Sequence, residues 1–363
     1  MNHVARLQRL QLELSENGLD QLLVTHLPNV RYLSGFTGSS AALLVEHDRA
    51  TLFTDGRYIA QAKEEVAGVR IVIGKKAPAV AAAEWLVART KRSRMQTLLG
   101  IEPESLTAGA RDRLAKLVRG KVRLRSAPPL VERARMVKDA EEIRLIRRAI
   151  DVGAGLFRVA RQTIKPGVRE VEVAAAMEYE ARSKAAEGMS FSTIIAAGAR
   201  SSVVHGRASG ARIPRRGFVV CDFGVILSGY YSDRTRTVHV GRPSPEARRL
   251  YAAVLQAQLA AIAAVRPGVT AAEVDAAARS VLRKARLAQY FTHSTGHGLG
   301  LEIHEAPRLA AGQDQTLEPG MVVTVEPGAY VPGKWGVRIE DVVVVTASGC
   351  EVLAPADKEL VVI

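Results

Sequence analysis

The sequence predicts an α/β N-terminal domain followed by an α+β C-terminal domain whose duplicated halves are related by a pseudo-two-fold axis. Three observations support this prediction. Helix and strand patterns alternate through roughly the first third of the 363 residues, a proline pair then interrupts the alternation, and one turn–helix–strand pattern occurs twice in the remainder. Because a chain of this length suits two domains, we expect one domain over residues 1–130 and a second over residues 131–363.

The first domain begins with a predicted amphipathic helix, which has leucines at positions 7, 10, 12 and 14 and which Gly18 can end. An apolar run at 21–25 then predicts a buried strand. By the same criteria, further strands are expected at 41–45, 51–53, 69–73, 98–101 and 122–124, and helices at 59–65, 80–88 and 105–118. Such alternation of helices and strands is typical of an α/β module.

A proline pair, Pro128 and Pro129, marks the end of this module. Neither proline can donate a hydrogen bond to a β-ladder or continue a helix, so both favour an irregular connection. A long charged helix is predicted to follow, from about Lys138 to about Arg161.

The second domain contains an internal repeat. Residues 165–168 (Lys-Pro-Gly-Val) and residues 266–269 (Arg-Pro-Gly-Val) lie 101 positions apart, and each is followed by Glu, Val and an alanine-rich helical pattern. Further along each copy, an apolar strand pattern ends in an acid, Asp222 or Glu326, shortly before a glycine. Chance similarity of two turn–helix units is the alternative, but a duplicated half accounts both for the matching helix starts and for the matching acids at the strand ends.

Composition restricts the class of protein. Hydrophobic residues make up 47% and charged residues 24% of the chain, which excludes a disordered tail, a collagen-like fibre and a small disulfide scaffold. No apolar run is long enough to span a membrane. The two cysteines, Cys221 and Cys350, fit a reducing compartment. We therefore expect a cytoplasmic protein with no membrane partner.

The net charge of +14 raises the possibility of a nucleic-acid partner. Basic side chains concentrate at residues 89–94 and again between Arg111 and Arg125. Such runs more often form a solvated surface, and no aromatic residues lie among them to stack on bases. We therefore expect no nucleic-acid partner.

Four acidic residues and a histidine-rich segment are the candidates for chemistry. Asp222 and Glu326 each end an apolar strand, and a second acid, Asp233 or Glu340, follows each of them. A carboxylate buried at the end of a strand needs a cation, a metal ion or several hydrogen-bond donors. Three histidines also occur within residues 293–304. Each of these residues alone would more often be structural, but together they predict oxygen-rich binding of divalent metal ions, and four carboxylates suffice for two ions.

At this level of detail the sequence resembles a known family. Its motifs are Asp222-Phe223-Gly224, the segments 232–237 and 296–300, His304-Glu305, Val325–Gly328 and Arg338–Asp341. In order and spacing these resemble the pita-bread metallopeptidases, which include methionine aminopeptidase, prolidase (Xaa-Pro dipeptidase) and aminopeptidase P. Segments 29–39 and 54–58 are similar to the N-terminal domain of the Xaa-Pro peptidases and creatinases. The resemblance implies a creatinase-like N-terminal domain and a pita-bread catalytic domain.

The resemblance also implies roles for individual residues and a homodimeric assembly. The implied cofactor is a pair of divalent metal ions, with Mn2+ favoured over Co2+ and Zn2+. His239 is interpreted as a surface residue of a strand. The implied metal ligands are Asp222, Asp233, His297, Glu326 and Glu340, the catalytic residues are His205, His304 and Glu326, and the substrate-binding residues are His293, Tyr330 and Arg338.

The function that follows is a metal-dependent exopeptidase that hydrolyses the X-Pro bond at the N-terminus of dipeptides or short peptides. The metal ions would activate a water molecule for attack on the scissile carbonyl. Proline forms a tertiary amide with no N–H, so a dedicated pocket is expected for it. The sequence leaves open whether the enzyme is a dipeptidase or an aminopeptidase. The alternatives are a creatinase-like hydrolase that needs no metal and a non-catalytic binding module.

Overall fold

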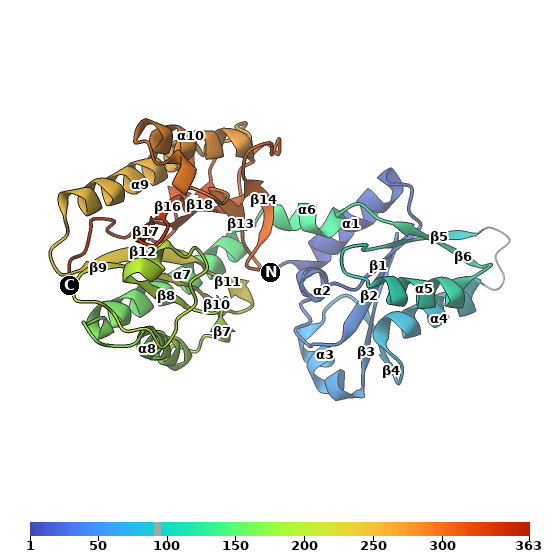
Figure 1. Ribbon diagram of the computed structural model, residues 1–363. Helices are drawn as coiled ribbons and strands as arrows, with labels where there is room; N and C mark the ends of the chain where they lie inside the picture. Colours follow the sequence, from blue (N-terminus) through green and yellow to red (C-terminus); the bar gives the residue numbers. More distant parts are fainter. Residues whose placement is uncertain (91–95) are drawn as a thin grey trace. The chain divides into compact units, whose positions relative to one another are not determined.

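The computed structural model describes residues 1–90 and 96–363 (Figure 1). These residues form two compact units, Met1–Arg135 and Met136–Ile363. Most of the predicted basic cluster at 89–94, namely residues 91–94, lies outside the described residues. Within the described ranges, no helix combines the length and the apolar character that crossing a membrane requires.

The first unit is built on a six-stranded sheet with the strand order β4-β3-β2-β1-β5-β6 (Figure 1). The pairs β1–β5, β5–β6 and β3–β4 are parallel, while β2 pairs antiparallel with β1 and β3. Helices α4 and α5 pack on this sheet through an apolar cluster that includes Phe53, Leu86 and Leu114. The elements are α1 His3–Glu16, β1 Gln21–Val24, α2 Leu27–Ser34, β2 Ala41–Glu46, β3 Ala50–Asp55, η1 Gly56–Tyr58, α3 Ile59–Glu65, β4 Arg70–Gly74, α4 Pro78–Thr90, β5 Thr97–Ile101, α5 Ala108–Val118, β6 Val122–Ser126 and α6 Leu130–Met136.

The predicted α/β class of this unit is confirmed, but several elements differ from the prediction, among them α6, which follows Pro129 where an irregular connection was expected. Helix α2 was not predicted, although Pro28 lies in its first turn and Gly35 ends it in the left-handed region at φ +80°. Leu12 lies in α1 as expected, but it is 72% exposed, and the buried face of the helix is formed by leucines 7, 10 and 14.

The second unit places helices α7 and α8 on one side of its strands and α9 and α10 on the other (Figure 1). Its two larger sheets have the orders β12-β9-β8 and β14-β13-β15-β18-β19. The elements are α7 Ala140–Thr163, α8 Glu170–Ser183, β7 Gly188–Met189, β8 Ile194–Ala197, η2 Gly198–Ser202, β9 Gly217–Phe223, β10 Val225–Leu227, β11 Tyr230–Tyr231, β12 Arg234–Val240, α9 Pro245–Ala264, α10 Ala271–Lys284, η3 Ala288–Tyr290, β13 Gly296–Gly298, β14 Glu305–Leu309, β15 Val322–Val325, β16 Gly328–Val331, β17 Trp335–Arg338, β18 Asp341–Val345 and β19 Cys350–Val352.

The predicted duplication is visible in the backbone of this unit. Helices α8 and α10 both have 14 residues and begin 101 positions apart. Before each helix a glycine adopts a positive φ, +88° at Gly167 and +83° at Gly268. The N–H of each glycine donates to an equivalent carbonyl, that of Ile213 or that of Leu317. The two-half architecture expected for the C-terminal domain is therefore confirmed.

Strand register brings the four predicted acids together. In the first half β9 and β12 are antiparallel, with Asp222 opposite Thr235, so that Asp222 lies close to the start of β12. In the second half Val325 lies opposite Asp341, which places the end of β15 beside the start of β18. The N–H of Glu340 donates to the carbonyl of Thr235 at 3.2 Å and joins the two halves. Both pairs of acids therefore meet where the halves meet.

Candidate metal centre

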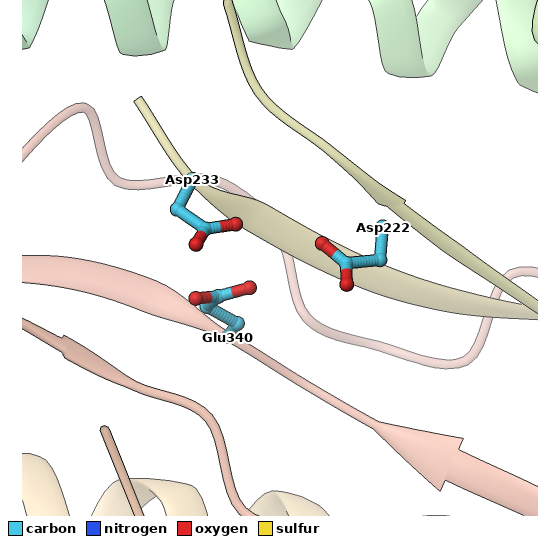
Figure 2. Close-up of side chains that lie close together, drawn as sticks. All are labelled: Asp222, Asp233 and Glu340. Carbon is cyan, nitrogen blue, oxygen red and sulfur yellow. The ribbon is translucent and has the colours of Figure 1, made fainter. Parts of the chain in front are cut away.

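Three of the predicted metal ligands form a compact cluster. Asp222 belongs to β9, while Asp233 and Glu340 directly precede β12 and β18. One carboxylate oxygen of each residue lies within 4.8 Å of the others, and all three residues are buried. Figure 2 shows Asp222 and Asp233 facing Glu340, which comes from the opposite strand. Buried carboxylates at this spacing are suited to binding a shared cation.

The other two predicted ligands, His297 and Glu326, lie beside this cluster. His297 Nε2 is 3.6 Å from Asp233 Oδ2 and 3.6 Å from Glu326 Oε1. The other ring nitrogen, Nδ1, lies 3.0 Å from the carbonyl oxygen of Gly298. Because a carbonyl can only accept, Nδ1 carries the hydrogen, and the lone pair of Nε2 faces the carboxylates. Burial lowers the pKa of His297 to about 4, so the neutral ring suited to metal binding is the stable form at neutral pH.

The electrostatics of the cluster call for positive charge. Burial, reinforced by the neighbouring carboxylates, raises the pKa of Asp233 and of Glu326 well above the usual range and that of Glu340 to about 8. Asp222 Oδ1 and Glu340 Oε1 are buried and have no hydrogen-bond partner among the described residues. Divalent cations would satisfy these orphaned oxygens and relieve the repulsion. The residues present therefore fit the metal ions that the sequence predicts.

Hydrogen bonds from neighbouring side chains hold the second carboxylate oxygen of Asp222 and that of Glu340. Arg338 Nη2 donates to Asp222 Oδ2 at 2.6 Å, and the hydroxyl of Thr235 donates to Glu340 Oε2 at 2.8 Å. Arg338 Nε in turn donates to Thr235 Oγ1 at 3.0 Å. Such contacts orient metal ligands. Thr235 was not singled out from the sequence, and its place opposite Asp222 follows only from the strand register.

The three predicted substrate-binding residues form one hydrogen-bonded chain. Arg338 Nη1 donates to the Tyr330 oxygen at 2.7 Å, and that oxygen lies 3.0 Å from His293 Nε2. His293 Nδ1 lies 2.8 Å from the carbonyl of Ser294, so Nδ1 carries the hydrogen and Nε2 accepts from Tyr330. Burial and the nearby Arg338 lower the pKa of His293 to about 4, and burial raises the pKa of Tyr330 to about 12. Both rings are therefore neutral at physiological pH.

A cavity of about 630 Å³ contains nearly all of the predicted site residues. Only Tyr330 is absent from its lining, and it reaches the site through Arg338 and His293. His304 is exposed at the wall, with its ring centroid 4.4 Å from that of His297. Partial burial and the nearby His205 lower the pKa of His304. Among the charged residues of the lining, sequence reasoning missed two arginines, Arg207 and Arg308.

Two glycines allow His297 to approach its neighbouring strands. At Gly296 a Cβ atom would overlap the carbonyl oxygen of Thr324, and at Gly298 it would overlap that of Ala306. The glycines therefore serve close strand packing around the ligand.

The interpretation of His239 as a surface residue is wrong. Its side chain is 2% exposed, and its Nδ1 lies 2.8 Å from the carbonyl of Gly241. Residues 361–363 pair alongside β12 at this position, with Val362 bridged to His239. Residues 361–363 thus cover a strand position that the local sequence pattern had indicated to be exposed.

Comparison with known proteins agrees with this geometry. The chain matches Metallopeptidase family M24 over residues 144–347 and the Creatinase/Prolidase N-terminal domain over residues 6–137. It is 37% identical to an Xaa-Pro dipeptidase of Pyrococcus furiosus, over 98% of this chain and 99% of that protein. It is 39% identical to the uncharacterized peptidase YqhT of Bacillus subtilis, over 99% of this chain and 100% of that protein. Among solved structures, the Xaa-Pro dipeptidase from Bacillus anthracis gives a TM-score of 0.93 at 38% identity with complete coverage of both chains. The X-Pro aminopeptidase from Thermotoga maritima gives 0.89 at 34% identity, covering 99% of this chain and 100% of that one.

Proposed function

The chain belongs to Metallopeptidase family M24, and from this membership we propose that its cavity hydrolyses the peptide bond that precedes proline. It is a metal-dependent exopeptidase of the Xaa-Pro type. The observation that carries the proposal is the set of buried acids with two orphaned oxygens beside the neutral His297. A creatinase-like enzyme without metal would have no use for this arrangement.

We propose that Asp222, Asp233, His297, Glu326 and Glu340 hold two divalent ions, with Mn2+ as the first choice for a site of four carboxylates and one imidazole. When bound, such ions supply a Lewis acid for the scissile carbonyl and lower the pKa of water. The homodimer implied by the resemblance remains a prediction.

The remaining polar residues receive proposed roles from their places in the cavity. Glu326 is 16% exposed and can take up a proton from the attacking water. His304 and His205, both exposed at the wall, can donate hydrogen bonds to the developing oxyanion or transfer a proton to the leaving nitrogen. The Arg338–Tyr330–His293 chain holds the substrate in position beside the carboxylates of the metal centre.

The two arginines favour a dipeptide substrate. Arg207 and Arg308 are exposed and line the cavity, and neither guanidinium has a partner among the described residues. Arg308 lies opposite His297 in the β13–β14 pair. A guanidinium binds a carboxylate through paired charge-assisted hydrogen bonds. The free carboxylate of an Xaa-Pro dipeptide would lie close to the scissile bond, where a longer peptide has an uncharged amide.

Removal of metal tests the proposed function. Treatment with EDTA is expected to abolish release of proline from an Xaa-Pro dipeptide, and added Mn2+ is expected to restore it, because the protein's own side chains provide no substitute for the cation. Proline release can be followed by a colorimetric assay, with an Xaa-Ala dipeptide as the control substrate. Activity that persists in the chelator would contradict the proposal and favour the metal-independent alternative.

Replacing Arg308 with alanine tests the substrate length. The variant is expected to raise KM for an Xaa-Pro dipeptide by about 10- to 100-fold, as the loss of a charged hydrogen bond predicts, and to leave an Xaa-Pro-Xaa tripeptide nearly unaffected. Arg248→Ala, at an exposed position of α9, is the matched control. An equal loss on both substrates would exclude Arg308 as the group that binds the carboxylate.

A further inference from the structure

A buried ion pair lies in the wall of the catalytic cavity. Lys138 Nζ is 3.0 Å from Glu305 Oε2, and the two side chains are only 1% and 6% exposed. The second oxygen, Glu305 Oε1, accepts from the N–H of Glu302 at 3.1 Å. Taking two charges out of water is unfavourable, so a buried ion pair of this kind adds little net stability to the fold. Its position indicates another role.

Glu305 stabilises the loop that connects β13 to β14. It directly follows His304 and lies opposite Gly298, the neighbour of His297. Its carboxylate packs against Gly300, where an added Cβ would come within 2.8 Å of both carboxylate oxygens. The carboxylate therefore contacts the backbone of the loop at residues 300 and 302.

The same loop is tied to the strand that leads to Asp233. The carbonyl of Gly300 accepts from the N–H of Tyr231 at 2.8 Å, two residues before Asp233. A displacement of the loop would therefore move both His304 and the segment beside the metal cluster.

Lys138 approaches Glu305 from a fixed backbone. Its N–H donates to the carbonyl of Gly320 at 2.9 Å, and the preceding Val137 bridges to Met321. The following residue, Asp139, caps helix α7 in a capping box with Glu142. The ammonium thus extends from a segment held on both sides, which suits it to fix the position of the Glu305 carboxylate.

We propose that the Lys138–Glu305 ion pair positions the 299–304 loop and so sets the place of His304 relative to the substrate. Both are positioning residues, because they act through His304. The proposal rests on the proposed function of the cavity.

The test compares Lys138→Met, Glu305→Gln and the double variant. Each single variant is expected to lower kcat for an Xaa-Pro dipeptide by about 10- to 100-fold, the usual effect of losing a group that orients a functional side chain, with little change in KM. The double variant is expected to lose less than the product of the two single effects, because both single changes break the same contact. Mn2+ content and the thermal midpoint are measured on every variant.

The chain offers a matched control in Lys334→Met. Lys334 pairs with Glu246 at 2.7 Å in the same unit, but these side chains are 47% and 57% exposed. This variant is expected to retain the kcat of the wild type, as an exposed pair contributes little.

Three results would overturn the proposal: an unchanged kcat in metal-loaded single variants, effects that multiply independently, or losses fully explained by missing metal or unfolded protein. Crystal structures supply a readout that needs no activity. In Glu305→Gln the ring centroids of His297 and His304 are expected to move from their 4.4 Å separation, and an unmoved pair would also overturn it. An inactive wild type would instead contradict the proposed function.

Discussion

Replacing Asp233 with asparagine is expected to lower kcat/KM by about a thousandfold and, in the metal-free protein, to raise stability. The loss follows because a metal ligand supports several kcal/mol of transition-state stabilisation, and each 1.4 kcal/mol corresponds to a factor of about ten. The gain follows because burial and the carboxylates of Glu340, Asp222 and Glu326 raise the pKa of Asp233, which means that the fold disfavours its charge.

Both effects can be measured on the same preparation. Steady-state kinetics with saturating Mn2+ gives the first, and urea unfolding in EDTA at pH 8 gives the second. Asp314→Asn, at an exposed position, is the control and is expected to change neither quantity. The electrostatic argument would be contradicted if the Asp233→Asn protein were less stable than the wild type without metal. That result would show that the fold stabilises the charged carboxylate of Asp233.

The metal-free protein is expected to lose stability as the pH rises from about 6.5 to about 8. Glu340 has its pKa raised to about 8, so in this range the folded state keeps a proton that the unfolded chain has already released. A group of this kind stabilises the fold below its unfolded pKa and loses that contribution as the pH approaches the folded value. Over 1.5 pH units the loss is about 2 kcal/mol for one such group.

Histidines act in the opposite direction but in a lower range. His293 and His297 have pKa values of about 4, so between about 4 and 6.5 the unfolded chain binds the extra protons, and stability from this source rises with pH. The interval above 6.5 therefore reports mainly the carboxylates. Urea titrations at pH 6.5, 7.2 and 8.0, each with EDTA or with Mn2+, check the prediction. Bound Mn2+ is expected to remove the decline, and a flat profile in EDTA would refute it.

The sequence revealed much of the site because strand patterns and acids coincide. Asp222 and Glu326 end apolar runs, and the repeat at 101 positions indicated that the two ends belong to equivalent halves. Antiparallel register then brings the second acid of each half, Asp233 or Glu340, close to the first. This proximity follows from regular strand pairing, which local sequence patterns can predict.

Contacts without a local pattern could not be predicted. Thr235 and Glu340 are 105 positions apart and Lys138 and Glu305 are 167 apart, and no single local motif contains both members of either pair. His239 lies in an ordinary strand sequence, and the tertiary course of residues 361–363 and the packing of Phe218 explain its burial. Helix α2 is short, and its apolar face is revealed only by packing.

All five proposed ligands lie within one residue of a paired strand, and none lies in the middle of a long loop. The coordination cage is thus preformed, so an ion can enter or leave without a folding transition. The ion that occupies a site of hard oxygen donors with one imidazole depends on geometry, ligand type and metal availability, so the supply of metal helps to govern occupancy. The metal found in a purified sample will consequently reflect the growth medium and the purification history, and reconstitution with defined ions must precede any comparison of activities.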